Sequence, residues 1–127
     1  MIGSIDTIIK EMEMKKMTFD EYSKDALRTL NRHLKWEELV YNAVLGMAGE
    51  IGEIADSIKK AKFQGHTYKP EDMAKEAGDL LWYVNLFCLT MGYSLEEVAE
   101  MNIEKLRNRY GEEFTSEKSI NRNEKDF

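Results

Sequence analysis

The chain of 127 residues lacks most of the features that mark secreted and membrane proteins. Cys88 is the only cysteine, so no disulfide can form within the chain, and its apolar neighbours predict a small buried side chain in a reducing compartment. No apolar run approaches the roughly 18 residues of a membrane span, and the N-terminus shows no basic stretch followed by an apolar one. We therefore expect a cytoplasmic protein that has no membrane partner.

An excess of basic residues is also missing. Lys and Arg number 18 against 24 Asp and Glu, which gives a formal net charge of −6. Sequence-independent binding of nucleic acid needs a basic face that displaces counterions, so no nucleic-acid partner is expected. An acidic protein that handles phosphate groups would instead need a bound cation. The hydrophobic content of 43% is near the globular norm, and the length fits a single domain with a real core.

Proline and strand-like segments are scarce, and the apolar residues repeat with the period of an α-helix. The pattern predicts an all-α fold, a bundle of about five helices completed by homo-oligomerisation, with helices near residues 5–16, 18–33, 36–60, 70–91 and 94–109. Residues 1–17 are interpreted as an N-terminal helical extension and 18–127 as the main domain. Thr18 and Ser94 each begin a capping box, Pro70 suits a first helical turn, and Gly92 suits a left-handed C-terminal cap.

Four acidic residues form two pairs at helical spacing. Glu50 and Glu53 lie three residues apart on one predicted helix, and Glu76 and Asp79 lie three apart on the next, so each pair projects from one helical face. Apolar residues and glycines surround both pairs, which indicates that the helices are buried. Buried carboxylates repel one another unless a cation neutralises them, and carboxylate-only sites favour Mg²⁺, with Mn²⁺ as a second choice. The pattern predicts a metal site suited to phosphate-bond hydrolysis.

Two other interpretations of these acids can be weighed on the sequence. A solvated helix face explains either pair alone, but two pairs in apolar surroundings favour a site over a charged surface. A di-iron carboxylate bundle needs a Glu-x-x-His ligand pair. Neither His33 nor His66 follows a glutamate by three residues, so the di-iron chemistry is rejected.

Several further residues are candidates for contacts with a substrate. Tyr83 lies one turn beyond Asp79 and could stack on a base or belong to the core. Lys60 and Lys62 end a predicted helix, where cations complement the helix dipole, so a structural role and a phosphate contact are both open. The glycines at 46, 49 and 52 leave gaps that allow close approach of a neighbouring helix or of substrate.

The acidic pairs resemble the signature of the MazG-type nucleotide pyrophosphohydrolases, which is E-x-x-E, a spacer, and E-x-x-D. Here it reads Glu50-Ile51-Gly52-Glu53 and Glu76-Ala77-Gly78-Asp79, and the similarity extends to residues 18–22, 46–50, 78–83 and 102–110. The resemblance implies an all-helical homodimer or homotetramer that hydrolyses a nucleoside triphosphate between the α and β phosphates. It also implies that the four acids hold Mg²⁺, and it supports phosphate contacts by Asn102 and Lys105.

The sequence leaves alternatives to this activity open. An all-helical dUTPase or a phosphoribosyl-ATP pyrophosphohydrolase of the same superfamily would use similar acids on a different substrate. A non-catalytic helical oligomerisation module, or one that binds nucleotide for regulation, is the rival from another class. The intact set of four acids argues against that rival.

Overall fold

The structure, a computed structural model, describes residues 4–12 and 17–122 and is helical almost throughout. The described residues form six α-helices and one 3-10 helix and contain no strand, which confirms the predicted all-α class. In chain order these elements are α1 (Ile5–Met12), α2 (Phe19–Ala26), η1 (Leu27–Thr29), α3 (Trp36–Phe63), α4 (Pro70–Thr90), α5 (Leu95–Tyr110) and α6 (Ser116–Ile120). The short helix α6 was not predicted.

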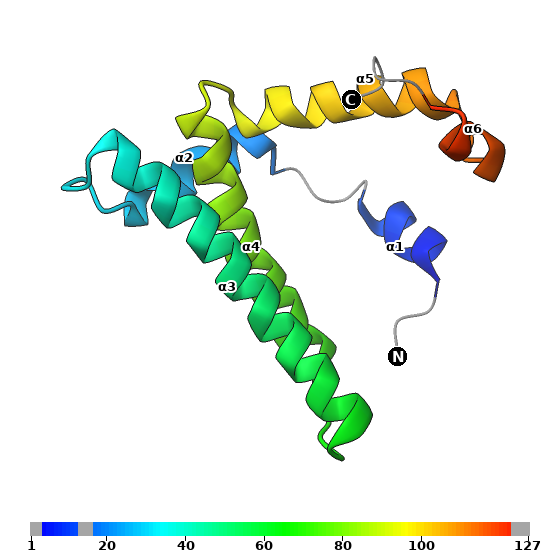
Figure 1. Cartoon of the computed structure of the whole chain (residues 1–127), viewed down its shortest axis with the longest axis horizontal. Coiled ribbons are helices and arrows are strands. Elements are labelled where there is room, and N and C mark those ends of the chain that lie inside the picture. The colour runs from blue at the N-terminus through cyan, green and yellow to red at the C-terminus, as the bar shows by residue number, and fades with distance from the viewer. Residues whose placement is uncertain (1–3, 13–16, 123–127) are drawn as a thin grey trace.

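An antiparallel hairpin of α3 and α4 is the main packing unit of the chain (Figure 1). α2 and the first turns of α5 lie at the open end of the hairpin, and α5 then extends away from the hairpin toward α6. α1 lies apart from the hairpin, and residues 13–16 of the predicted first helix fall outside the described residues. Among the helices described, none has both the length and the apolar character that crossing a membrane requires.

Most helix ends follow from local signals that the sequence carries. The Thr18 and Ser94 hydroxyls each accept a hydrogen bond from the backbone amide three residues further on, which confirms both N-caps. Pro70 occupies the first position of α4, where its missing N–H costs nothing. Gly92 follows α4 with φ +86°, as expected for a glycine that ends a helix.

The helix predicted for residues 18–33 is too long. α2 ends at Ala26 and passes into the 3-10 turn η1, because the indole of Trp82 donates hydrogen bonds to the Ala26 carbonyl at 2.9 Å and to the Thr29 hydroxyl at 3.0 Å. The Asn31 side chain then accepts from the His33 amide and forms a turn that leads into α3. A contact with a residue more than 50 positions away therefore ends this helix.

The predicted end of the next helix, at residue 60, falls one turn short. α3 continues to Phe63, where the amides of Gln64 and His66 both donate to the Lys60 carbonyl. Gly65 takes φ +70° at this point, a conformation that side chains other than glycine rarely adopt. The loop between α3 and α4 is correspondingly shorter than predicted.

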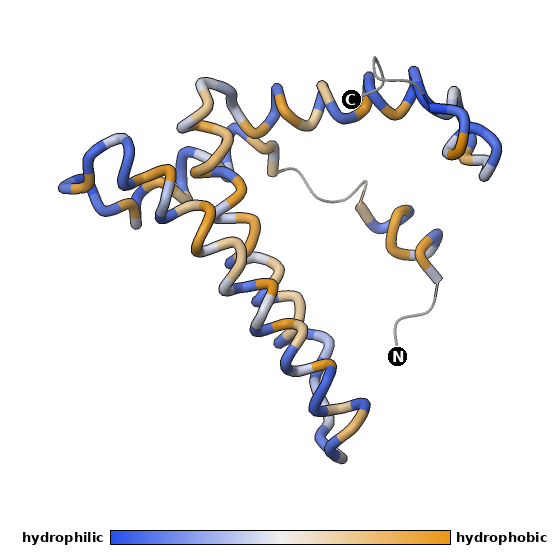
Figure 2. The backbone as a smooth tube through the Cα atoms, viewed as in Figure 1, coloured by the Kyte–Doolittle hydropathy of each residue, from blue (hydrophilic) through white to orange (hydrophobic). Residues whose placement is uncertain are grey.

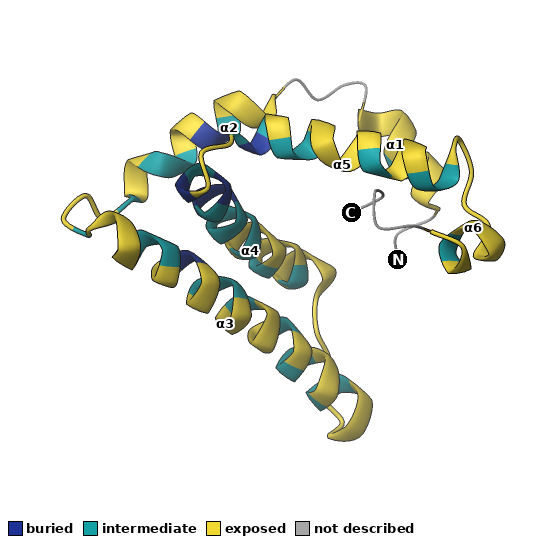
Figure 3. Ribbon diagram, turned by 45° about the horizontal axis from the view of Figure 1, so that its top comes forward, coloured by how far each residue is buried: buried dark blue, intermediate teal, exposed yellow. Residues whose placement is uncertain are grey.

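The buried core is small and lies mainly where α2, α4 and α5 meet (Figure 3). Its apolar members are Ala43, Leu86, Cys88 and Leu95. Burial raises the pKa of the Cys88 thiol, which agrees with the apolar setting predicted for it. Large apolar side chains along α3 and α5 are exposed, among them Val44, Leu45, Ile51, Ile58, Met101, Ile103 and Leu106. The predicted burial is therefore wrong for α3 in a single chain, because α3 packs mainly on α4, but it is confirmed for the second half of α4, where Asn85, Leu86 and Cys88 are buried.

A buried hydrogen bond fastens α2 to α4. The Ser23 hydroxyl donates to the side-chain oxygen of Asn85 at 2.7 Å, and Asn85 is only 1% exposed. A buried amide oxygen without a donor would lose its hydration with no compensation. The bond therefore holds α2 over the end of the hairpin, beside the Trp82 indole.

We expect Ser23→Ala to lower the free energy of unfolding by about 1–3 kcal/mol, because it leaves the Asn85 oxygen buried and unpaired. Urea denaturation followed by circular dichroism measures this change. Ser116→Ala, at an exposed position on α6, is the matched control and should stay within about 0.5 kcal/mol of the wild type. Equal stability of wild type and Ser23→Ala would contradict the role given to this bond.

Candidate active site

Carboxylates from α3 and α4 converge on one face of the hairpin. Glu50 of α3 and Glu76 and Asp79 of α4 each contribute one carboxylate oxygen, and these oxygens all lie within 4.8 Å of one another. Helical spacing places Glu76 and Asp79 on neighbouring turns. The pairing of the two helices adds Glu50, which is 26 positions earlier in the chain. The three residues are called the acid triad below.

Glu53 borders the acid triad, one turn beyond Glu50. Its carboxyl shares a hydrogen bond with Glu76, and this bond, followed by the charges of Glu76 and Asp79, raises the pKa of Glu53. Two carboxyl groups can hydrogen-bond to each other only by sharing a proton, and a cation can take the place of that proton. The structure thus gathers all four predicted acids, with three able to bind one ion and the exposed Glu53 beside them.

The buried oxygens of the acid triad fit a divalent cation. Oε2 of Glu50 and Oε2 of Glu76 are both buried and make no hydrogen bond within the described part of the chain. An ionised oxygen that has lost its water needs a donor or a cation. The ion pairs on the hairpin use other acids, since Asp56 binds Lys59 and Lys60 while Glu71 binds Lys75. Oxygen-only ligands of this kind suit hard divalent ions.

A pocket of about 430 Å³ opens beside the acid triad and is called the aromatic pocket below. Its lining consists of Thr29, Glu50, Asp79, Trp82 and Tyr83. The rings of Trp82 and Tyr83 meet edge to face, with their centroids 5.1 Å apart. Hydrogen bonds from the indole to α2 and η1 hold the Trp82 ring in place. The pocket therefore joins two aromatic rings, set nearly perpendicular to each other, to two carboxylates.

Gly46 lets the Tyr83 ring lie against α3. A Cβ atom at position 46 would overlap the Tyr83 ring, closer than any real Cβ contact. The predicted gap for a neighbouring helix is thus filled by an aromatic side chain from α4. A Cβ at Gly49 or Gly52 would meet no atom within 4 Å in the described residues, so these two gaps face open space in a single chain.

A second pocket, of about 510 Å³, lies between the acid triad and the closed end of the hairpin. We call it the tip pocket. Glu76 of the acid triad lines it, together with Lys60, Lys69 and Lys75. Lys60 was a predicted substrate contact, whereas Lys69 and Lys75 were not predicted. Figure 2 shows that this end of the hairpin is mostly hydrophilic.

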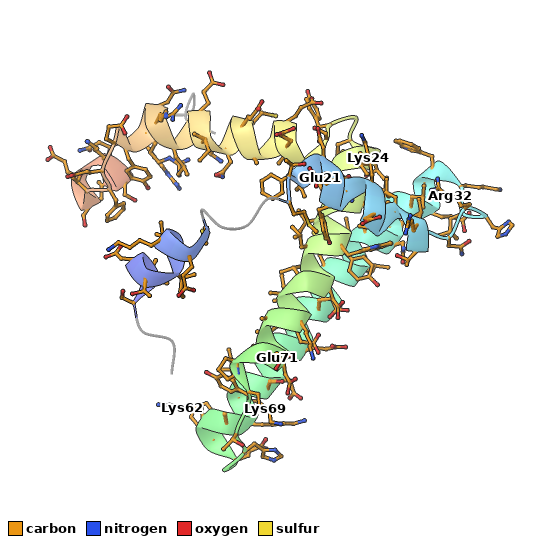
Figure 4. All side chains as sticks on the ribbon, turned by 180° about the vertical axis from the view of Figure 1, so that it is seen from behind. Glu21, Lys24, Arg32, Lys62, Lys69 and Glu71 are labelled. Atoms are coloured by element: carbon orange, nitrogen blue, oxygen red, sulfur yellow. The ribbon has the colours of Figure 1, made fainter. Side chains whose placement is uncertain are left out.

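Three predicted substrate contacts lie away from the acid triad in a single chain. Lys62 is at the closed end of the hairpin but lines neither pocket (Figure 4). Asn102 and Lys105 line a separate pocket of about 350 Å³ on α5, together with Val98 and Met101. The single chain therefore brings Tyr83 and Lys60 to the acids and leaves Asn102 and Lys105 apart from them.

Two residues near the acids were not predicted from the sequence. Thr29 lines the aromatic pocket, but its position inside a predicted helix hid the turn that places it there. Tyr22 is half-buried close to Asp79, and burial, followed by the negative charge of Asp79, raises the pKa of its phenol. A signal for Tyr22 existed, because it belongs to the segment 18–22 that resembles the MazG-type enzymes.

Comparisons with known proteins agree with the geometry. The sequence profile of the MazG nucleotide pyrophosphohydrolase domain matches residues 41–114, which include all four acids. Gene 37 protein of Mycobacterium phage L5 is 32% identical over 69 residues, which cover 51% of this chain and 60% of the phage protein. No solved structure matches the chain. Since the profile covers more than half of the sequence and its acids converge as a metal site requires, the chain belongs to the MazG nucleotide pyrophosphohydrolase family.

Proposed function

We propose that the protein is a Mg²⁺-dependent pyrophosphohydrolase that cleaves ribo- or deoxynucleoside triphosphates between the α and β phosphates. The observation that carries this proposal is the convergence of Glu50, Glu76 and Asp79 from two helices, beside an aromatic pocket, in a chain of the MazG family. The oxygen of a water molecule would bond to the α phosphorus while the bond from that phosphorus to the α–β bridging oxygen breaks, so that this oxygen leaves with pyrophosphate. The proton lost by the water would pass to a carboxylate of the site and then to solvent. The products are a nucleoside monophosphate and pyrophosphate.

The acids would divide between holding the ion and orienting the water. Glu50, Glu76 and Asp79 would hold Mg²⁺, which when bound supplies positive charge that offsets the triphosphate and polarises its phosphorus–oxygen bonds. Glu53 is exposed next to the acid triad, so its carboxylate is placed to accept a hydrogen bond from the attacking water. Each of the four acids then has a proposed role that follows from its position in the site.

The aromatic pocket would bind the nucleoside. Trp82 and Tyr83 provide aromatic walls, either of which can pack against a base, and the Thr29 hydroxyl adds a polar group that can contact the base or the sugar. Gly46 determines how closely the Tyr83 ring lies against α3, because any larger residue would push that ring outward. Base contacts by Tyr83 and Trp82 would therefore depend on a glycine that touches no substrate.

A second copy of the chain would complete the site. Asn102 and Lys105 lie on α5 away from the acids, beside apolar side chains that a single chain leaves exposed, such as Met101 and Ile103. A homodimer or homotetramer that lays α5 of one copy over the hairpin of another would bury these side chains and bring both polar residues to the phosphates. The substrate and a second copy of the chain are thus the proposed partners.

Divalent cations should stabilise the wild type and fail to stabilise variants of the acid triad. An ion at about 100 times its Kd adds about 2.7 kcal/mol, which would raise Tm by several degrees. Asp79→Asn should melt above the metal-free wild type, because one repelling charge is gone, and should gain little from Mg²⁺. Thermal melts with and without Mg²⁺ measure both effects. Glu71→Gln, an acid on α4 outside the triad, should keep the full metal shift, and an equal shift in Asp79→Asn would refute the site.

Pyrophosphate release tests the activity directly. A panel of ribo- and deoxynucleoside triphosphates should give release from the wild type only with Mg²⁺, and Glu53→Gln and Asp79→Asn should each lose about a hundredfold or more. Circular dichroism checks that both variants keep their helices, and Glu71→Gln again serves as the control. Absence of release from every nucleotide would overturn the proposal, and phosphoribosyl-ATP would be the next substrate to test.

Subunit mixing tests whether α5 acts across an interface. Asp79→Asn and Asn102→Ala/Lys105→Ala should each be nearly inactive alone, whereas their mixed oligomer should regain activity, because one of its sites combines intact acids with an intact α5. Co-expression with two affinity tags isolates the mixed oligomer, and light scattering gives its mass. A monomer in solution, or an inactive mixed oligomer, would contradict completion of the site by a second copy.

A further inference from the structure

The two pockets on either side of the acid triad differ in chemistry. Glu50 and Asp79 line the aromatic pocket, which has no lysine or arginine in its wall. Glu76 lines the tip pocket, so this pocket begins at the acid triad and continues toward the closed end of the hairpin. A substrate that meets the ion at the triad can therefore extend in two directions that offer opposite surroundings.

Cations dominate the tip pocket. Lys60, Lys69 and Lys75 line it against the carboxylates of Asp72 and Glu76, and Glu76 already belongs to the acid triad. The pocket also contains hydroxyl groups that can donate hydrogen bonds, such as that of Thr67. Lysine ammonium groups and hydroxyls are the donors that bind phosphate oxygens in proteins. An anion with several oxygens fits this lining, whereas a base or sugar carries no charge that would complement the three lysines.

The lysines can turn toward a ligand. Lys69 forms no ion pair with another described residue, and it provides no side-chain cap for α4. Lys60 pairs with Asp56 at 2.8 Å and Lys75 with Glu71 at 3.5 Å, but these are partly or largely exposed pairs within single helices. Such pairs contribute little to stability and yield readily to a multiply charged ligand.

The dimensions suit a phosphate chain. Lys69 precedes Glu76 by seven residues on α4, which corresponds to roughly 10 Å along the helix axis. A flexible lysine side chain spans part of that distance toward the acid triad. Figure 4 shows Lys69 at the closed end of the hairpin. Phosphates beyond the one attacked would therefore meet ammonium groups along this path.

We propose that the tip pocket binds the β and γ phosphates of the substrate, and pyrophosphate after cleavage, with Lys69 and Lys75 as the principal contacts. This assignment rests on the proposed function and adds the direction of the substrate, with the nucleoside in the aromatic pocket and the leaving group toward the closed end. The reverse direction would place the most highly charged part of the substrate against Glu50 and Asp79 with no lysine or arginine in that pocket's wall.

Calorimetric titration of inorganic pyrophosphate into the full chain, in buffer with Mg²⁺, tests the assignment without turnover. Each lysine lost should weaken pyrophosphate binding by about tenfold. Lys69→Ala should therefore bind pyrophosphate about tenfold more weakly than the wild type, and Lys69→Ala/Lys75→Ala about a hundredfold more weakly. Lys24→Ala removes the same charge from α2, at the opposite end of the hairpin (Figure 4), and should bind pyrophosphate like the wild type. Binding of a nucleoside monophosphate should be the same in all four proteins.

Three results would overturn the tip pocket as the pyrophosphate site. These are a wild type that does not bind pyrophosphate, a double variant that binds it as tightly as the wild type, and an equal loss in Lys24→Ala. Turnover of nucleoside triphosphates, measured in parallel, separates this inference from the proposed function. If the wild type hydrolyses nucleoside triphosphates but the double variant binds pyrophosphate as tightly as the wild type, only the assignment of the tip pocket is refuted. If pyrophosphate binding depends on the lysines but no nucleoside triphosphate is hydrolysed, only the proposed activity is refuted.

Discussion

The antiparallel pairing of α3 and α4 is the constraint on which the site depends. Each helix alone carries two acids that water could solvate, but their pairing brings oxygens of Glu50, Glu76 and Asp79 within 4.8 Å of one another. Like charges at this distance oppose the packing of the hairpin, and two of the oxygens are buried without a donor. A cation at the triad would turn this repulsion into attraction, so the energy that binds the ion is also energy that closes the hairpin.

The helices could be predicted wherever a local signal decides their ends. Thr18, Ser94 and Gly92 act within a few residues of their own position, and the structure confirms each of them. The end of α2 could not be predicted, because it depends on the Trp82 indole, which reaches the Ala26 carbonyl only after α4 has folded against α2. Helix propensity over residues 27–33 gives no warning of a tertiary hydrogen bond.

Local signals and tertiary contacts also differ in which parts of the candidate site they allow to be predicted. Spacing along single helices was enough to select the four acids and Tyr83, which the structure gathers at the hairpin. Thr29 was missed because its turn lies inside a predicted helix, and Lys69 and Lys75 were missed because they enter the site only as part of a pocket that α3 and α4 form together. Asn102 and Lys105 were predicted from their spacing on one helix, with support from the family resemblance, and a single chain leaves them on another surface. Spacing selects residues on one helix, whereas tertiary packing decides which helices meet.

Exposed apolar surface on α3 and α5 connects the stability of the chain to the proposed assembly. Fully burying one large aliphatic side chain yields about 1.5–3 kcal/mol, and side chains such as Leu45, Ile51 and Met101 are more than half exposed in a single chain. If α5 of a second copy covers α3, the contact that buries these side chains also delivers Asn102 and Lys105 to the acids. Folding, assembly and phosphate binding would then share one interface, and each would depend on protein concentration in the same way.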